Sequence, residues 1–289
     1  MRKVLCAILA LCLAASMTAC AGSGNSSTSE SSTSESSVAE ETSSESSAVE
    51  ENSSDVSASE EETSGTDAEA TVMSYDEYMA AAVDDPVTIQ AYVQAKQAYY
   101  AEQETATVYL QDQDGGYFAY DMKCSQEDYD AMTEGTCIQV SGYKAEWSGE
   151  VEIMDGQLDS IVEGDTFVAD ALDVTDLLGT EDLQSHQNEK VSFTGLTVAP
   201  STDANGNEAA FLYNYDGSGT QGDDLYFNVT VGDSEEVYTF TVESYLCDSS
   251  SEVYKAVEGL QVGQTIDAEG FLYWYEGVNP HITSVTVAG

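Results

Sequence analysis

Alternating hydrophobic and polar positions recur in the last two thirds of the chain and predict short β-strands. Each run has a period of two, as expected for strands that bury one face. A helix is predicted between the third and fourth strands, because Ser125 is followed three residues later by Asp128, a spacing that caps a first helical turn. In chain order the predicted elements are Val87–Val93, Ala106–Asp112, Tyr117–Met122, the helix opened by Ser125, Gly135–Tyr143 and Gln157–Val162.

The same order of elements recurs about 100 residues later. Ser249 and Glu252 repeat the helix-opening spacing after the third strand, and a polar stretch, 218–225, is inserted after the second. Ser74 and Thr180 predict one further short helix before each copy. The second copy is predicted over Val191–Val198, Ala210–Asp216, Val237–Val242, the helix opened by Ser249, Gly263–Phe271 and Ile282–Val287.

Three strands, a capped helix and two strands form the order of an OB-fold, a five-stranded barrel with its helix between strands three and four. Closure removes the exposed edges that five short strands would otherwise leave. The predicted fold class is therefore all-β with short helices, as two tandem OB-fold-like barrels after a disordered N-terminal tether. The predicted boundaries are 71–168 for the first barrel, 169–184 for a connector and 185–289 for the second barrel.

The first 20 residues have the pattern of an export signal. Arg2 and Lys3 precede an apolar run, Val4–Ala15, that is too short to span a bilayer. Met17–Cys20 then resembles a bacterial lipobox, which implies cleavage before Cys20 and a lipid on its thiol. We expect a signal peptide over 1–19 and a lipid-anchored protein on the extracytoplasmic face of the cell membrane of a Gram-positive bacterium.

Residues 21–70 contain 18 Ser and 13 Asp or Glu, with no Lys, Arg or aromatic residue. Such a segment cannot bury enough apolar surface to offset the entropy of ordering, so residues 20–70 are predicted to be a disordered tether. Repulsion between its like charges favours extended conformations.

Charge changes the expected partners of the folded part. The chain has 54 Asp and Glu against 7 Lys and Arg, and residues 71–289 hold 41 acids against 5 Lys. Phosphate-driven binding needs several cationic contacts. Nucleic acid is therefore expected to be an unlikely partner.

Three stretches resemble OB-fold, nucleic-acid-binding-type domains of secreted and lipid-anchored proteins of Clostridia-like bacteria: Val87–Lys96, Tyr117–Tyr129 and Gly142–Ile153. The resemblance covers the first copy well and the second weakly. It implies a scaffold and carries no catalytic motif, and a fold does not by itself fix a function.

Catalytic patterns are missing from the sequence. It has no Gly-x-Ser-x-Gly elbow, no phosphate-binding Gly-x-x-x-x-Gly-Lys loop and no His-Glu-x-x-His helix. The two histidines, His186 and His281, lie on different copies and do not cluster as zinc ligands do. We expect a protein without enzymatic activity and without a cofactor.

Calcium is the one cation that the sequence favours at all, since hard cations take carboxylate and carbonyl oxygens. The weak candidates are Asp112 and Asp114 in one loop and Asp203, Asn205 and Asn207 in another. The same residue types also build ordinary turns, so both interpretations stay open.

Three cysteines remain once the signal segment and the lipid-bearing Cys20 are set aside: Cys124, Cys137 and Cys247. Cys124 and Cys137 could bridge the two ends of the first helix. The second copy keeps the first of these cysteines but has Thr265 in place of the second, which favours a small buried residue. The disulfide therefore stays open.

Aromatic residues in the predicted strands and loops are the remaining signal for a ligand. OB-folds bind oligonucleotides and oligosaccharides on the face of strands two and three and on adjacent loops. Tyr and Trp are also favoured in strands for packing, so scaffold and ligand face both remain open. The candidates for the ligand face are Tyr99, Tyr117, Tyr120, Trp147, Tyr213, Tyr226, Tyr273, Trp274 and Tyr275.

These observations predict a lipid-anchored extracellular binding or interaction module whose ligand is a protein, a neutral glycan or a cation-bridged partner. One alternative is the binding of single-stranded nucleic acid or oligosaccharide on the OB-fold face. Another is a calcium-stabilised structural or adhesive module.

Overall fold

The computed structural model describes residues 71–164 and 166–288, which belong to one compact unit, Gly65–Gly289. The predicted signal peptide, Cys20 and the tether lie outside the described residues. Among the residues described, no helix is both long and apolar enough to cross a membrane. The elements are α1 Tyr75–Ala80, β1 Pro86–Lys96, β2 Thr105–Gln111, β3 Gly116–Lys123, α2 Gln126–Ala131, β4 Cys137–Trp147, β5 Glu150–Val162, β6 Leu172–Asp173, η1 Thr175–Leu177, η2 Glu181–His186, β7 Lys190–Ala199, β8 Ser201–Thr202, β9 Glu208–Ala209, β10 Leu212–Tyr213, β11 Leu225–Val231, β12 Tyr238–Val242, α3 Glu252–Glu258, β13 Thr265–Phe271 and β14 His281–Val287.

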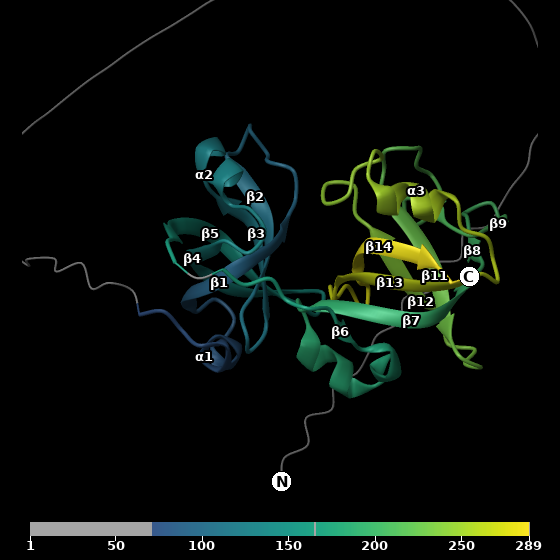
Figure 1. The fold of residues 1–289 in the computed structure, drawn as a ribbon, viewed down its shortest axis with the longest axis horizontal. Helices are drawn as coiled ribbons and strands as arrows, with labels where there is room; N and C mark the ends of the chain where they lie inside the picture. Colours follow the sequence, from purple (N-terminus) through teal and green to yellow (C-terminus); the bar gives the residue numbers. More distant parts are fainter. Residues whose placement is uncertain (1–70, 165, 289) are drawn as a thin grey trace, which may run out of the picture. The chain divides into compact units, whose positions relative to one another are not determined.

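Strands β1 to β5 form the first barrel (Figure 1), a closed sheet in the order β1-β2-β3-β5-β4. It closes because β1 pairs with both β2 and β4, and β3 pairs in parallel with β5. Helix α2 joins β3 to β4, which is the place of the helix in an OB-fold. Ser125 caps α2 by accepting a hydrogen bond from the Asp128 N–H, as predicted.

The core of the first barrel is filled by the inward side chains of its strands, among them Val108 and Ile138. Tyr78 of α1 adds to this core, and its ring lies 5.1 Å from that of Tyr117. Ser74 and Glu77 form a complete capping box at the start of α1, as predicted. These contacts attach α1 to the barrel.

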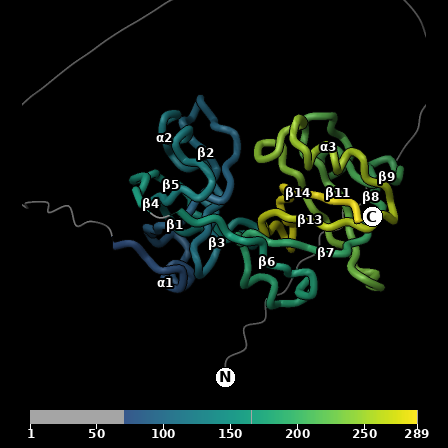
Figure 2. The backbone as a smooth tube through the Cα atoms, in the orientation of Figure 1, coloured from purple at the N-terminus to yellow at the C-terminus, as the bar shows by residue number. Residues whose placement is uncertain are grey.

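Strands β7, β11, β12, β13 and β14 form the second barrel, whose backbone path is drawn in Figure 2. The sheet runs β11-β12-β14-β13-β7 and closes because β11 also pairs with β7. Helix α3 joins β12 to β13, so the connectivity matches that of the first barrel. The prediction of two tandem five-stranded OB-like barrels is confirmed.

The core of the second barrel is aromatic as well as aliphatic. Phe240 lies at its centre, with its ring 4.7 Å from that of Phe193 and 5.8 Å from that of Phe227. All three rings are fully buried. Close packing of three aromatic side chains stabilises the barrel beyond the burial of their area alone.

The predicted second strand of the second copy is wrong in position. In the interval 210–216 only Leu212–Tyr213 is a strand, and the long strand is β11, Leu225–Val231. In β11, Leu225, Phe227 and Val229 point into the core, so the alternating pattern lies just past the stretch that was interpreted as a polar insertion. The connection between β7 and β11 holds β8, β9 and β10.

Two predicted helix starts also differ from the structure. The N-cap of α3 is Ser251, whose side chain accepts from the Tyr254 N–H, so the helix begins two residues after the predicted start at Ser249. Thr180 precedes a 3₁₀ helix, η2, and makes no side-chain cap hydrogen bond. Successive Ser residues offer several equivalent cap spacings, and packing of α3 against the core selects one of them.

Candidate ligand-binding face of the second barrel

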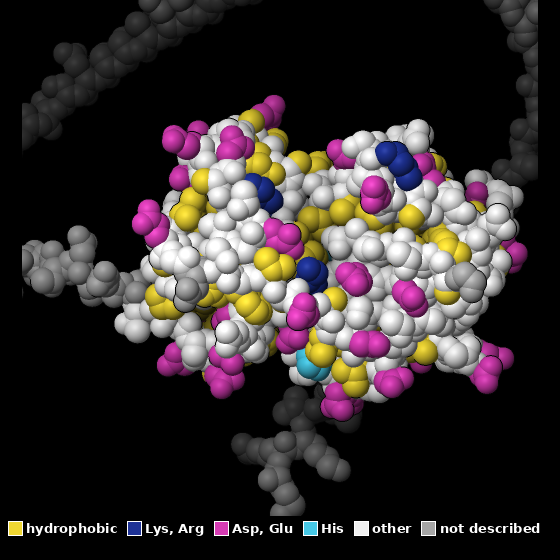
Figure 3. Space-filling model, viewed as in Figure 1, with side chains coloured by type: hydrophobic (Ala, Val, Ile, Leu, Met, Phe, Trp, Pro, Cys, Tyr) yellow, Lys and Arg dark blue, Asp and Glu magenta, His cyan; other side chains and the backbone are white. Residues whose placement is uncertain are grey.

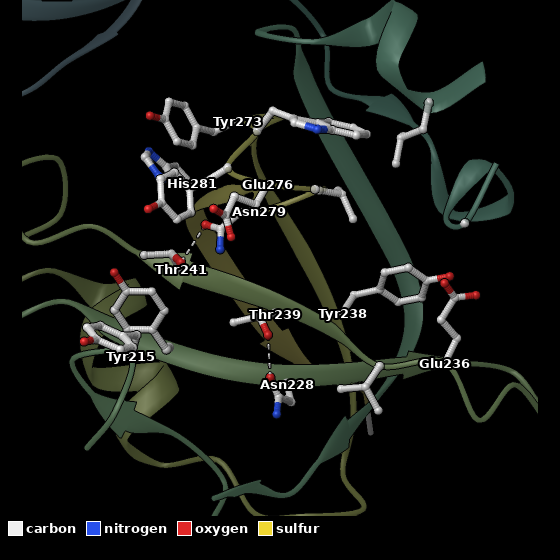
Figure 4. Close-up of a pocket in the computed structure, with 18 of the residues that line it drawn as sticks. Tyr215, Asn228, Glu236, Tyr238, Thr239, Thr241, Tyr273, Glu276, Asn279 and His281 are labelled. Carbon is white, nitrogen blue, oxygen red and sulfur yellow. Dashed lines mark hydrogen bonds between the residues drawn. The ribbon is translucent and has the colours of Figure 1, made fainter. Parts of the chain in front are cut away.

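A groove of about 1310 Å³ lies against the outer face of β11 and β12 and under the loop that joins β13 to β14 (Figure 4). We call it the β11–β12 groove. In the OB-fold these are strands two and three and the loop between strands four and five, which together form the usual ligand face. The groove therefore lies where the fold places a binding site.

The floor of the groove is polar because apolar and polar side chains alternate along β11 and β12. Their apolar side chains point into the core, which leaves two cross-strand pairs on the outer face: Tyr226 opposite Thr241, and Asn228 opposite Thr239. Thr239 Oγ1 donates to Asn228 Oδ1 at 2.8 Å. Thr241 Oγ1 donates to Asn279 Oδ1, also at 2.8 Å, and so attaches the floor to the loop. Figure 4 shows both hydrogen bonds.

Aromatic rings line the walls of the groove. Tyr273, Trp274 and Tyr275 come from the β13–β14 loop, and Tyr215 comes from the β10–β11 connection. The rings of Tyr273 and His281 are stacked, with centroids 4.2 Å apart. Tyr215 and Tyr275 are exposed, which leaves their rings free to contact a ligand.

The groove is acidic. Its lining contains five carboxylates and neither Lys nor Arg. Burial, with a smaller contribution from Asp224, raises the pKa of Glu243 to about 7. Burial lowers the pKa of His281 to about 3, so its ring is neutral at physiological pH. The carboxylates are Glu181, Asp224, Glu236, Glu243 and Glu276.

Acidic side chains are also spread over the rest of the surface, as the face drawn in Figure 3 shows. The described residues hold five Lys. One of them, Lys144, is buried and donates to the carbonyl oxygens of Tyr78, Met79 and Ala81 at the end of α1. This lysine therefore stabilises a helix end and does not contribute to a ligand face.

The matching face of the first barrel is partly covered. Tyr109 of β2 and Phe118 of β3 form the outer cross-strand pair there, and both are buried. They pack with Phe271 at the end of β13, and the rings of Tyr109 and Phe271 are stacked 4.5 Å apart. Tyr109 Oη also bonds His281 Nδ1 at 2.5 Å. The second barrel thus covers this part of the first barrel's β2–β3 face, while other residues of β2 and β3 line a second cavity beside it.

The structure places the nine aromatic candidates in different environments. Four of them, Tyr226, Tyr273, Trp274 and Tyr275, line the β11–β12 groove. Tyr99 and Tyr120 line a second cavity, which Tyr273 also lines. The remaining three lie elsewhere: Tyr117 is buried in the first core, Trp147 is exposed at the β4–β5 turn, and Tyr213 donates to Glu258 Oε1.

The weak calcium candidates lie in two turns whose carboxylates already accept hydrogen bonds. Asp112 Oδ1 accepts from the N–H groups of Asp114 and Gly115. Asp203 Oδ1 accepts from those of Asn205 and Asn207. Within the described residues no group of three or more His, Cys, Asp or Glu is arranged to hold a metal ion. The three remaining cysteines are free thiols.

Sequence reasoning missed the polar residues of the groove: Asn228, Thr239, Thr241 and Asn279. The signal was present in the alternation of 225–231, where polar residues separate core residues. Placing strand two at 210–216 hid this alternation. The aromatic candidates therefore do not include the amide and hydroxyl groups that form the floor.

Comparisons with known proteins give structural similarities only. No protein-family model matches the chain, and no curated protein matches it. The murine DNA binding protein bound with double-stranded DNA is 12% identical, with a TM-score of 0.32, over 71% of this chain and 97% of its own. The Ifi202 HINa domain in complex with 20-bp double-stranded DNA is 11% identical, with a TM-score of 0.30, over 72% and 96%. The replication protein A heterotrimer bound to single-stranded DNA is 12% identical, with a TM-score of 0.26, over 71% and 49%.

These structures correct one prediction. Nucleic acid was expected to be an unlikely partner because the chain is acidic, yet all three of these proteins hold DNA. The expectation that nucleic acid is an unlikely partner is therefore wrong. The OB-fold assignment itself rests on the strand order of this chain.

Proposed function

We propose that the chain is a non-catalytic binding protein whose β11–β12 groove holds a single-stranded nucleic acid. The observation that carries this proposal is the open groove, with aromatic walls and an amide- and hydroxyl-lined floor, on strands two and three of a closed OB barrel. OB-folds bind single strands by stacking bases on aromatic rings. Tyr275 and Tyr215 offer exposed rings for stacking.

The acidic lining determines how the strand is oriented. With no Lys or Arg in the groove, phosphates gain nothing by entering it, so they point to solvent while bases face the floor. Asn228 and Asn279 offer amide groups to base edges, and carboxylates accept hydrogen bonds from exocyclic amines. Binding then depends on stacking, which contributes about 1–3 kcal/mol per base.

This orientation predicts an unusual response to salt. Proteins that contact phosphates lose affinity as salt rises, because bound counterions are released on association. Here added salt screens repulsion between phosphates and carboxylates. Affinity for an oligonucleotide is expected to stay constant or to rise with salt.

The test is titration of a labelled oligothymidylate by fluorescence anisotropy over a range of salt concentrations. Tyr275→Ala removes a groove ring and is expected to weaken binding about tenfold. Tyr143→Ala is the matched control, since Tyr143 is equally exposed, at 49%, but lies on β4 of the first barrel. No binding at any salt concentration, or equal loss in both variants, would contradict the proposal.

Oligosaccharide is the second candidate ligand, and the acidic lining is the observation that favours it. Sugar rings stack on aromatic side chains, and their hydroxyl groups donate to carboxylates and amides. A neutral oligosaccharide meets no charge repulsion in this groove. Competition of neutral oligosaccharides against the labelled oligonucleotide separates the two ligands.

We also propose that the protein is lipid-anchored outside the cytoplasm. The support is the apolar run Val4–Ala15 followed by the lipobox-like Met17–Cys20. Expression in a Gram-positive host and fractionation test this. Cys20→Ala is expected to move the protein out of the membrane fraction, and an unchanged distribution would contradict the anchor.

A further inference from the structure

A second cavity, of about 540 Å³, lies beside the β11–β12 groove, at the junction of the two barrels. We call it the tyrosine pocket. Three residues line both cavities: Glu243, Tyr273 and His281. The two cavities are therefore adjacent and share one wall.

Aromatic rings form a connected series from one cavity to the other. The rings of Tyr120 and Phe118 lie 6.4 Å apart, and those of Phe118 and Tyr273 lie 5.4 Å apart. Tyr273 then stacks on His281 at 4.2 Å. The series starts on β3 of the first barrel and ends at the first residue of β14 in the second.

The tyrosine pocket exposes large apolar rings that the fold does not need to expose. Tyr245 is 68% exposed, Tyr100 is 44% exposed and Tyr120 is 43% exposed, and all three line this one cavity. Exposed aromatic groups gathered at one place are typical of interaction sites. The Ala98 N–H donates to the Tyr245 carbonyl oxygen at 2.8 Å, which joins the segment that carries Tyr245 to the β1–β2 loop.

Two tyrosine hydroxyl groups near the pocket are already bonded. Tyr99 Oη donates to the Cys124 carbonyl oxygen, which fixes its ring in place at the base of the cavity. Tyr109 is bonded to His281. Tyr99 and Tyr109 are therefore held in place beside the accessible rings of Tyr100, Tyr120 and Tyr245.

We propose that the tyrosine pocket is a second subsite, which stacks the next base of the single strand held in the β11–β12 groove. This inference rests on the proposed function and extends it. The first barrel then contributes to binding through its β1–β2 loop and through the part of its β2–β3 face that stays accessible, where Tyr120 lies. The occupied site runs from Tyr275 past Tyr273 to Tyr245 and Tyr100.

The experiment compares ligands of two lengths on the full chain. One oligothymidylate has about three nucleotides, enough for the groove, and the other about eight, within the range of a single OB-fold site. Tyr245→Ala is expected to weaken binding of the long ligand about five- to tenfold and to leave that of the short ligand unchanged. Tyr245→Phe keeps a stacking ring and is expected to keep wild-type affinity. Tyr143→Ala again serves as the control.

The outcomes separate the subsite from the groove. If the short ligand binds and the long ligand binds no more tightly, the subsite is absent while the proposed function stands. Equal weakening of both ligands by Tyr245→Ala also overturns the subsite, because it indicates a general structural effect. If neither ligand binds wild type, the proposed function and the subsite fail together.

Discussion

The outer faces of strands two and three differ sharply between the two barrels, although both barrels have the same strand order. In the first barrel this face presents Tyr109 and Phe118, which are buried by contacts with the second barrel. In the second barrel the equivalent face presents Asn228 and Thr239, which stay accessible and line a groove. The central pair of the first face stabilises the contact between the barrels, and the second face stays open as the proposed ligand face.

The difference follows from the residues at outward positions of the alternating pattern. Aromatic side chains at these positions gain free energy by leaving water, and therefore favour contact with another apolar surface. Amide and hydroxyl groups lose hydrogen bonds with water when they are buried without partners, and therefore favour an open face. Two barrels with the same strand order can thus expose this face to different extents.

The largest expected effect comes from removing a buried ring from the covered outer face of the first barrel. Phe118 contacts the rings of Tyr109, at 5.0 Å, and Tyr273, at 5.4 Å. Phe118→Ala leaves a cavity among these rings and is expected to lower the free energy of unfolding by about 3 kcal/mol. Denaturant unfolding measures it, with Tyr143→Ala as an exposed control expected to change stability by about 0.5 kcal/mol or less. A loss below about 1 kcal/mol would mean that the face is open in solution.

A second, smaller effect concerns a carboxyl group at the same junction. Glu150 is fully buried, its Oε2 accepts from the Trp274 N–H at 2.8 Å, and its Oε1 has no hydrogen-bond partner among the described residues. Burial raises its pKa to about 9. The unfolded chain loses this proton near pH 4.5, so the folded protein holds it more tightly, and stability falls as pH rises from there to about 9.

Glu150→Gln removes this dependence. The variant is expected to match wild type near pH 4 and to exceed its stability by about 1–3 kcal/mol at pH 9. Thermal or denaturant unfolding across this pH range measures the difference. A smaller slope remains in the variant, because burial also raises the pKa of Glu152 and of Glu243 to about 7. Parallel pH profiles for the two proteins would contradict the assignment to Glu150.

The strand order of both barrels could be predicted from the sequence. For most elements the period-two alternation of the strands, the capping spacing of the helices and the turn residues all indicate the same order. The difference between the outer faces of the two barrels could not be predicted in this way. Tyr109 lies within the predicted strand 106–112 and Phe118 within 117–122, and a pattern of alternation does not say whether the outward side is covered by another domain.

A third effect is the pH dependence of oligonucleotide affinity in the groove. Glu243 lines both cavities, and its pKa is raised to about 7 by burial. Lowering the pH from about 8 to about 6 protonates it and removes one negative charge from the groove, so affinity for an oligonucleotide is expected to rise about threefold. Glu243→Gln is expected to abolish this rise, whereas Glu181→Gln, at an exposed position of the same groove, keeps it. A pH response that survives in Glu243→Gln would assign it to another group.

The last variant tests whether the open face of the second barrel contributes to stability. Thr239→Val keeps the shape of the side chain but removes the hydrogen bond from Thr239 Oγ1 to Asn228 Oδ1. Because Asn228 stays accessible and can bond water instead, the expected loss is about 0.5–1 kcal/mol, well below that of Phe118→Ala. Denaturant unfolding of the two variants side by side makes the comparison. Equal losses of unfolding free energy in the two variants would mean that both outer faces stabilise the fold. That result would contradict the interpretation of the groove as a ligand face.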